Sequence, residues 1–292
     1  MNDLISSSSL AALVSAQPDE RYWLVVEQHS ETLRRLYELD ATPDITWLFD
    51  ETRYASARDI GPLVVAAQPG TALWNAFAES EGAAPLSGIV VSSQVERDVV
   101  IAHLRHRLEA RFYGNRCGLL RYYDPWVAAH LFTATSSSSW LEPLTALYWH
   151  GGTFRQRAQH GATWYAYRPT STAGTMVQIN ETGDPISLTP DQEERLETFV
   201  AQYPLWQHVS KNSGLDERSA EHARRFVAAL EESKRLSIPE HELLDFVLLR
   251  FEHSQEPLPQ EVDTYPPEAR LAALQQHFHP KEENTIIGRD RA

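Results

Sequence analysis

Between Tyr22 and Asp124 the sequence alternates short β-prone runs with segments of helical periodicity. The β-prone runs are rich in aliphatic and aromatic residues, and the helical segments repeat apolar side chains every three or four residues. Strands alternating with helices are typical of an α/β lobe whose sheet is at least partly parallel. We therefore expect an α/β (α+β) N-terminal lobe with a mostly parallel or mixed sheet. The expected strands are 22–27, 45–49, 62–66, 88–91 and 119–123, and the expected helices are 31–39, 71–81, 126–132 and one that Ser92 or Ser93 caps and that reaches Leu108.

Aromatic residues dominate the segment between Trp140 and Tyr167. Two runs in it, 146–149 and 163–167, are predicted as edge or antiparallel strands that complete the lobe. Alternating aromatic side chains more often pack a sheet than bind a ligand, and we favour packing here. The alternative is a binding surface that stacks on a sugar or a peptide. Its residues would be Trp140, Tyr148, Trp149, Trp164, Tyr165 and Tyr167.

The pattern of the chain changes after the turn-rich stretch 180–185. Beyond it we expect only helices, at 189–203, 217–235, 239–253 and 266–278. Thr189 with Gln192, and Ser237 with Glu240, fit the capping box that begins a helix. The expected organisation is a flexible N-terminus at 1–19, the α/β domain at 20–185, a helical C-terminal lobe at 186–280 and a polar tail at 281–292.

The charge of the chain excludes several kinds of partner. It has 40 acidic and 26 basic residues and a formal net charge of −14, whereas nucleic acids and anionic membranes need a basic surface. No stretch approaches the roughly 20 apolar residues of a membrane span, and the N-terminus lacks the basic start of a signal peptide. Cys117 is the only cysteine, which excludes disulfides within the chain, and we expect it to be buried. We expect a cytoplasmic protein that contacts neither nucleic acid nor membrane.

Motifs for catalysis and cofactor binding are missing from the sequence. It has no Gly-x-Ser-x-Gly elbow, no Gly-x-Gly-x-x-Gly turn and no Walker lysine. His103 and His106 stand three apart on an expected helix, but no third ligand is evident, so an exposed polar face is favoured over a metal site. The run His241-Glu-Leu-Leu-Asp245 departs from the zinc-protease motif at its last position. We expect no catalytic residue, no cofactor and no metal, and neither folding nor partner binding should need a metal ion or a nucleotide.

The run Arg121-Tyr-Tyr-Asp-Pro-Trp126 lies at an expected strand-to-helix junction. Pro125 suits the first turn of a helix, so Asp124 is placed to cap that helix. The Asp124 carboxylate is also within reach of a bidentate interaction with Arg121. The two tyrosines would point to opposite faces of the sheet. We interpret the run as a structural joint, and the alternative is an α/β hydrolase that uses Asp124 and one of the histidines.

The expected helix 239–253 carries a wide apolar surface. At about 100° per residue its apolar side chains fill an arc of roughly 200°, which is wider than one packing face requires, and Leu249 lies outside it. Either the helix is central and surrounded by its neighbours, or part of its surface lines a groove for an apolar partner segment. The arc consists of Leu243, Leu244, Phe246, Val247, Leu248 and Phe251.

Five segments together resemble a known family over about residues 20–150. They are the opening run 22–27, Trp47-Leu-Phe49, Gly61-Pro-Leu-Val64, His103-Leu-Arg105 and Arg121-Tyr-Tyr-Asp-Pro125. In this order and spacing they resemble the adaptor chaperones of bacterial type VI secretion, of the Tap or Tec type, which are catalogued as a domain of unknown function. Trp126 departs from the family pattern, which often has a basic residue at this position.

The resemblance implies a two-lobed accessory protein and not an enzyme. Such adaptors bind a toxic effector in the cytoplasm and promote its loading onto the VgrG spike. Under this interpretation the apolar arc of helix 239–253 would bind the effector, with the aromatic set between Trp140 and Tyr167 as the alternative surface. The excess of acid from residue 186 onward, 20 Asp and Glu against 12 Lys and Arg, would favour a partner segment with basic flanks. An interaction protein unrelated to secretion would lack the same motifs and is the remaining alternative.

Overall fold

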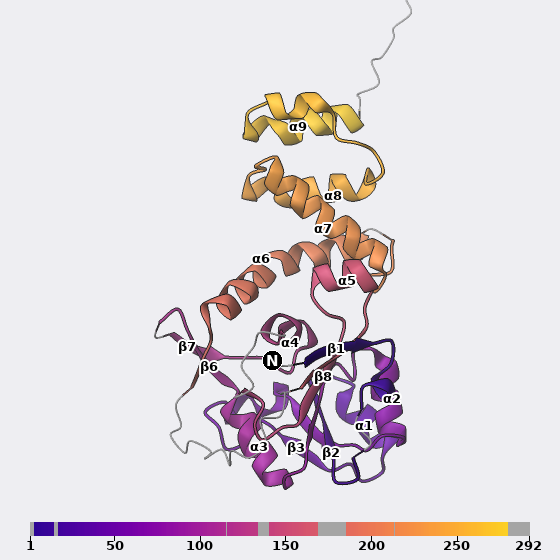
Figure 1. Ribbon diagram of the computed structural model, residues 1–292, viewed down its shortest axis with the longest axis vertical. Helices are drawn as coiled ribbons and strands as arrows, with labels where there is room; N and C mark the ends of the chain where they lie inside the picture. The colour runs from indigo at the N-terminus through magenta and orange to yellow at the C-terminus, as the bar shows by residue number, and fades with distance from the viewer. Residues whose placement is uncertain are drawn as a thin grey trace, which may run out of the picture. The chain divides into compact units, whose positions relative to one another are not determined.

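A computed structural model describes residues 3–14, 17–114, 116–133, 140–168, 185–212 and 214–279 (Figure 1). The chain divides into two compact units, Met1–Ala201 and Gln202–Ala292, and each is described by itself. The first unit contains two sheets and their helices, whereas the described residues of the second are helical apart from turns and loops. Of the predicted boundary stretch 180–185, residues 180–184 lie outside the described residues, and so does the polar tail at 281–292.

The first unit is built on a seven-stranded sheet in which every neighbouring pair of strands is antiparallel. The strand order is β1-β9-β8-β5-β2-β4-β3. The strands are β1 (Asp3–Ser7), β2 (Arg21–Val26), β3 (Ile45–Trp47), β4 (Leu63–Ala66), β5 (Gly88–Ser93), β8 (Ala146–His150) and β9 (Trp164–Arg168).

The expectation of a mostly parallel or mixed sheet is therefore wrong. β4 and β5 are joined through α2 (Ala72–Ser80) and do run in the same direction, as a crossover predicts. However, β2 lies between them and is antiparallel to both, with Val26 opposite Leu63 on one side and Gly88 on the other. Alternation along the sequence indicates the crossover, but it does not indicate which strand fills the place between its two ends.

A smaller three-stranded sheet has the order β10-β6-β7. It contains β6 (Glu109–Phe112), β7 (Arg116–Leu119) and β10 (Ile186–Ser187), with β10 parallel to β6 and β7 antiparallel to it. The predicted strand at 119–123 is wrong, because strand pairing stops at Leu119 and the chain turns at the next residues. Cys117, which we expected to be buried, is exposed on β7.

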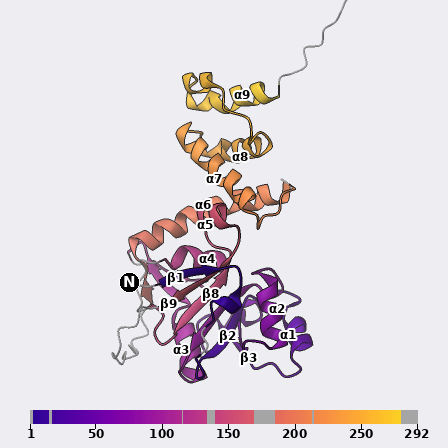
Figure 2. The ribbon, with the colours of Figure 1, turned by 45° about the vertical axis from the view of Figure 1, so that its right-hand side comes forward.

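The seven-stranded sheet is covered on both faces. β2 alternates between them, since Trp23 and Val25 belong to one core while Tyr22 and Leu24 belong to the other. Buried side chains of α3 (Arg97–His106) and α4 (Pro125–Leu131) complete the first core, and those of α1 (Thr32–Leu39) and α2 complete the second. Figures 1 and 2 show α3 and the α1–α2 pair on opposite sides of the sheet. This double burial explains why the run at β2 is continuously apolar.

Some local predictions at the ends of elements need correction. Ser92 and Ser93 do not cap a helix: both belong to β5, and Glu96 precedes α3 as its N-cap without a side-chain hydrogen bond. Thr71 does cap α2, because its side chain accepts a hydrogen bond from the Trp74 N–H at 3.3 Å. The remaining short elements of the first unit are η1 (Leu10–Ala12), η2 (Ala55–Ile60) and α5 (Phe154–His160).

The N-terminal residues differ from the flexible segment that we expected at 1–19. β1 pairs with β9 from Asp3 opposite Arg168 to Ser7 opposite Trp164. Leu10 is also buried in the second core, together with neighbouring apolar residues. Because residues 3–7 contain few apolar side chains, their extended form depends on the edge that β9 offers, which is a tertiary contact.

α6 (Pro190–Asn212) is longer than the helix predicted at 189–203, and Pro204 lies inside it. Its start confirms the first capping box: the Gln192 N–H donates to Thr189 Oγ1 at 3.3 Å, and the Thr189 N–H donates to Gln192 Oε1 at 3.0 Å. The compact units divide within α6, after Ala201, whereas the sequence placed the boundary at 185.

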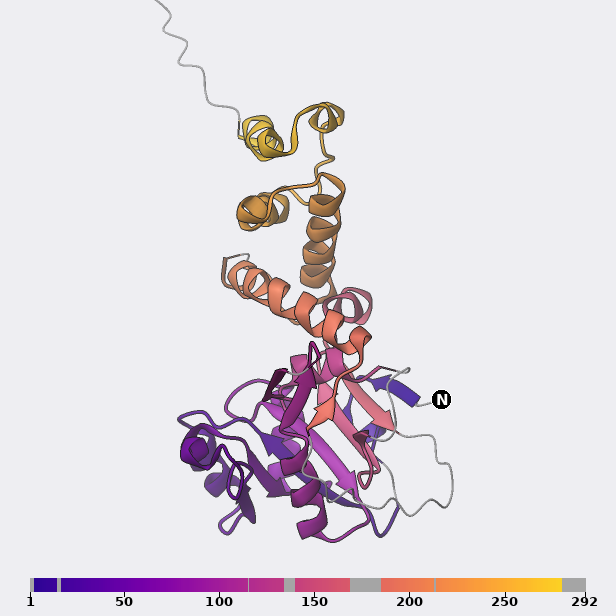
Figure 3. The same cartoon turned by 90° about the vertical axis from the view of Figure 1, so that its left-hand side faces the viewer.

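The second unit contains α7 (Ala220–Arg235), η4 (Glu240–Glu242), α8 (Leu243–Glu252), η5 (Gln260–Thr264) and α9 (Pro267–Phe278). α7 packs against α8, as Figure 3 shows. The second predicted capping box is wrong, because Ser237 is left-handed (φ 48°) and Glu242 precedes α8 without a side-chain cap. Among the residues that the structure describes, no helix combines the length and apolar character needed to cross a bilayer.

Candidate functional site

The Asp124–Pro125 junction begins α4 as the sequence predicts. Asp124 has extended backbone angles and its Oδ1 accepts a hydrogen bond from the Trp126 N–H at 2.8 Å. Pro125 occupies the first turn, where a missing N–H costs nothing. The capping role that we predicted for Asp124 is therefore confirmed.

Arg121 has a second carboxylate partner that the sequence did not indicate. Its Nη2 lies 3.7 Å from Asp124 Oδ2 and also forms an ion pair with the Glu27 carboxylate. Glu27 directly follows β2, 94 positions away in the sequence. The joint therefore ties the end of a central strand to the start of α4 through one guanidinium group. Only the position of Glu27 at the end of an apolar run was visible in the sequence.

Burial controls the electrostatics of this joint. The pKa of Asp124 is raised, first by removal of its carboxyl group from water and then by the neighbouring Glu27 carboxylate. The Arg121 guanidinium and the backbone N–H of Trp126 oppose this rise. Burial likewise raises the pKa of Tyr123 to about 12. The joint therefore holds two nearby carboxylates whose negative charge Arg121 partly compensates.

Replacing Asp124 with alanine should lower the free energy of unfolding by about 0.5–2 kcal/mol, because α4 loses its side-chain cap. Urea denaturation at pH 7 measures this loss. Asp124→Asn is the matched variant, since its amide oxygen can still accept the Trp126 N–H bond, and it should retain most of the stability. If Asp124→Ala instead kept full stability and lost one specific activity, the structural interpretation would be wrong.

We expected the two tyrosines of the joint to point to opposite faces of a sheet, and this expectation is wrong. Residues 121–123 are not a strand, and both rings enter the same core, 5.7 Å apart and edge to face. Tyr122 is fully buried, and its hydroxyl donates a hydrogen bond to the Leu104 carbonyl of α3 at 2.8 Å. Tyr122 therefore fastens the joint to α3.

Trp126 belongs to an aromatic cluster that joins α4, α5 and the first half of α6. Its ring stacks on Phe199 at 6.1 Å, and the Arg157 guanidinium lies over it at 3.8 Å. His130 also stacks on Phe199, at 4.6 Å, and Phe154 completes the cluster. The adaptor family that this chain resembles often has a basic residue at the position of Trp126. In this chain the position instead carries an aromatic ring, and the cation over that ring comes from Arg157 of α5.

His130 is neutral in this cluster near pH 7. Burial lowers its pKa to about 4. Its Nδ1 lies 2.8 Å from the Trp126 carbonyl, which can only accept, so Nδ1 carries the proton. The His130 carbonyl in turn accepts a hydrogen bond from Arg195 of α6 at 2.9 Å. These contacts could not be predicted from the sequence, because they join three separate helices.

The other predicted aromatic surface is interior. All six residues of that set are buried, so the favoured interpretation as sheet packing agrees with the structure. Trp149, for example, stacks on Tyr165 at 5.8 Å within the first core. The residues of the set are Trp140, Tyr148, Trp149, Trp164, Tyr165 and Tyr167.

The predicted apolar arc on α8 is divided by burial. Phe246, Val247 and Phe251 are in the interior of the second unit, so they are not available as groove walls. Leu243, Leu244 and Leu248 are half-buried. Leu249, which the helical wheel placed outside the arc, is also buried, and so is Arg250, which interrupts the arc between Phe246 and Leu243. Arg250 tolerates this position because it forms hydrogen bonds to Glu232 and to two backbone carbonyls.

Comparison with known proteins identifies one domain. Residues 22–142 match the model of a family described as Domain of unknown function (DUF4123). The match begins in β2 and includes the joint at 121–126, so it lies inside the region where we found the resemblance. No curated protein and no solved structure matches the chain. The resemblance is thus confirmed at the level of a domain whose description assigns no activity.

Proposed function

We propose that this chain is a non-enzymatic, cytoplasmic adaptor that binds a type VI secretion effector and promotes its loading onto the VgrG spike. The observation that carries the proposal is the DUF4123 match over residues 22–142, in the region that resembles the type VI adaptor chaperones. The role of Asp124 as a helix cap also supports it, because this carboxylate has a structural function. A chain with two compact units offers separate surfaces for an effector and for the spike.

Effector recognition is placed in the helical unit under this proposal. Of the two surfaces considered, the aromatic set is wholly buried, whereas α8 keeps Leu244 and Leu248 half-buried beside exposed Asp245. Leu244 and Leu248 are four residues apart and therefore lie on one side of the helix. An apolar strip beside acidic groups suits an effector segment with apolar anchors and basic flanks.

The proposal predicts co-purification with an effector encoded beside this gene. The tagged full chain is co-expressed with each neighbouring gene product, and a toxin-like protein or a VgrG-like spike protein should be captured in stoichiometric amount. A bacterial gene neighbourhood that encodes neither kind of protein, or no capture of either, would contradict the adaptor function.

An exchange of the helical region tests where recognition lies. The junction belongs after Ala201, because Gln192, Arg195 and Phe199 make contacts within the first unit that an earlier junction would remove. The chimera with residues 202–280 from a related adaptor should capture the effector of that adaptor, and the reciprocal chimera should capture the original one. If effector choice follows residues 1–201 in both chimeras, recognition lies in the first unit.

A further inference from the structure

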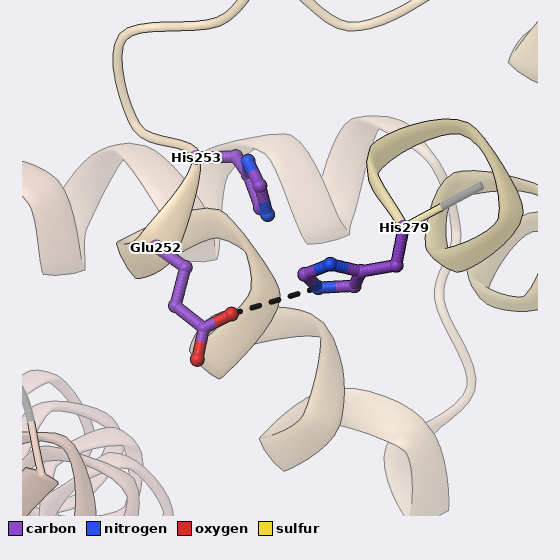
Figure 4. A group of neighbouring side chains, drawn as sticks. All are labelled: Glu252, His253 and His279. Atoms are coloured by element: carbon purple, nitrogen blue, oxygen red, sulfur yellow. Dashed lines mark ion pairs between the residues drawn. The ribbon is translucent and has the colours of Figure 1, made fainter. Parts of the chain in front are cut away.

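Three side chains from two helix ends converge in the second unit. Glu252 and His253 lie at the C-terminal end of α8, and His279 directly follows α9. One possible ligand atom from each lies within 4.8 Å of the others, and Figure 4 shows the three side chains directed toward one another. His279 Nε2 lies 3.6 Å from Glu252 Oε2.

His253 has the hydrogen bond that orients a metal-binding histidine. Its Nδ1 lies 2.7 Å from Glu256 Oε1, and because a carboxylate accepts, Nδ1 carries the proton. In the neutral imidazole, Nε2 then keeps its lone pair. A carboxylate behind a histidine is the usual second contact of a histidine that binds metal, since it fixes the tautomer and raises the basicity of the free nitrogen.

His253 Nε2 has no hydrogen-bond partner within the described part of the chain. This nitrogen is buried, although the side chain is 17% exposed. Phe278 stacks on the imidazole at 4.6 Å with an angle of 12° between the rings, which holds the ring in place. A buried acceptor without a donor costs free energy, and a cation next to Nε2 would remove that cost.

We propose that Glu252, His253 and His279 bind one Zn²⁺ ion between the ends of α8 and α9. Two imidazole nitrogens and one carboxylate oxygen are a donor set that zinc accepts, at about 2.0–2.2 Å from the ion. Tetrahedral ligands at that distance are about 3.4 Å apart. Glu252 and His279 are exposed and can close the remaining distance, whereas His253 is held by Glu256 and Phe278.

The ion would tie the end of α9 to α8. Because folding brings the three ligands together, Zn²⁺ binds the folded state and stabilises it. The sequence did not indicate the site, since His279 is far from the other two ligands in the chain. The ion is an addition to a chain that we still expect to fold without metal.

The test is a Zn²⁺ titration of the full chain after treatment with a chelator. Calorimetry should give one ion per chain, and Zn²⁺ should raise the melting temperature until the chelator is restored. Removing an outer carboxylate partner lowers metal affinity by roughly 10–100-fold, so Glu256→Gln should fall in that range. His279→Ala and Glu252→Gln remove ligands and should lose at least as much.

His277→Ala is the matched control. His277 lies on α9 two residues before His279 and is exposed, but it is not part of the group. Its removal should leave the affinity unchanged, and far-ultraviolet circular dichroism should be the same for all variants. Co²⁺ gives a second readout, because a tetrahedral site has strong visible bands that His279→Ala should abolish. No saturable binding, or equal losses in His277→Ala and His279→Ala, would overturn the proposal.

Discussion

Gly88→Ala should be among the most destabilising single substitutions in the first unit. Gly88 lies in β5 opposite Val26 of β2, in the middle of the sheet. A Cβ atom at this position would collide with the Val25 carbonyl and would lie only 2.8 Å from Val26 Cα. Since both obstacles are backbone atoms, the two strands must separate to admit the methyl group. We expect the free energy of unfolding to fall by about 3 kcal/mol or more, at the upper end of overpacking effects.

Gly70→Ala is the control variant, because it introduces backbone strain without a steric collision. Gly70 is left-handed (φ 89°), and no atom in the described part of the chain lies within 4 Å of a Cβ there. Its substitution should cost about 1–2 kcal/mol from strain alone. Denaturant unfolding of both variants gives the comparison. If Gly88→Ala loses no more stability than Gly70→Ala, the close approach of β2 and β5 is wrong.

Acidification should destabilise the protein between about pH 6.5 and pH 4 through two histidines whose imidazoles are removed from water, His130 and His103, the second of which we expected on an exposed polar face. Burial lowers the pKa of His130 to about 4 and that of His103 to about 3. In the unfolded chain a histidine binds its proton near pH 6.5, so in this window the unfolded state holds more protons. The contribution of these neutral histidines to the free energy of unfolding is therefore complete above pH 6.5 and is lost as the pH falls toward their pKa values in the folded protein. For His130 the loss is on the order of 3 kcal/mol at pH 4.

His130→Phe tests this linkage with little loss of packing. A phenylalanine keeps an aromatic ring beside Phe199 and Phe154 but cannot bind a proton. The free energy of unfolding of this variant should decrease less steeply from pH 6.5 to pH 4 than that of the natural chain. His277→Ala, which removes an exposed histidine, should keep the natural slope. A natural slope in His130→Phe would mean that His130 does not control the pH dependence.

Local features of the fold were predictable from the sequence because their causes span a few residues. The Asp124 cap and the Thr189–Gln192 capping box are examples, since each forms within one helical turn. The strand at β2 and the helix at α2 were predictable for the same reason: runs of apolar residues and their periodicity act locally. The structural role of the 121–126 joint also followed from this local chemistry.

Contacts between distant residues decided the rest. The Glu27 partner of Arg121, the Phe199 partner of Trp126 and the group around His253 join segments with no common pattern in the sequence. Apolar periodicity predicted one apolar arc on α8, but Leu249 outside the arc is buried while Leu244 and Leu248 inside it are half-buried, because burial depends on how α7 packs there.

The relative directions of the strands likewise depend partly on local sequence and partly on tertiary structure. The crossover from β4 through α2 to β5 was visible in the sequence, and both strands do run the same way. Only the tertiary structure places β2 between them and makes every neighbouring pair antiparallel. The physical reason is that strand hydrogen bonds form between whichever backbones become adjacent, and adjacency depends on the packing of the whole unit and not on the residues within each strand.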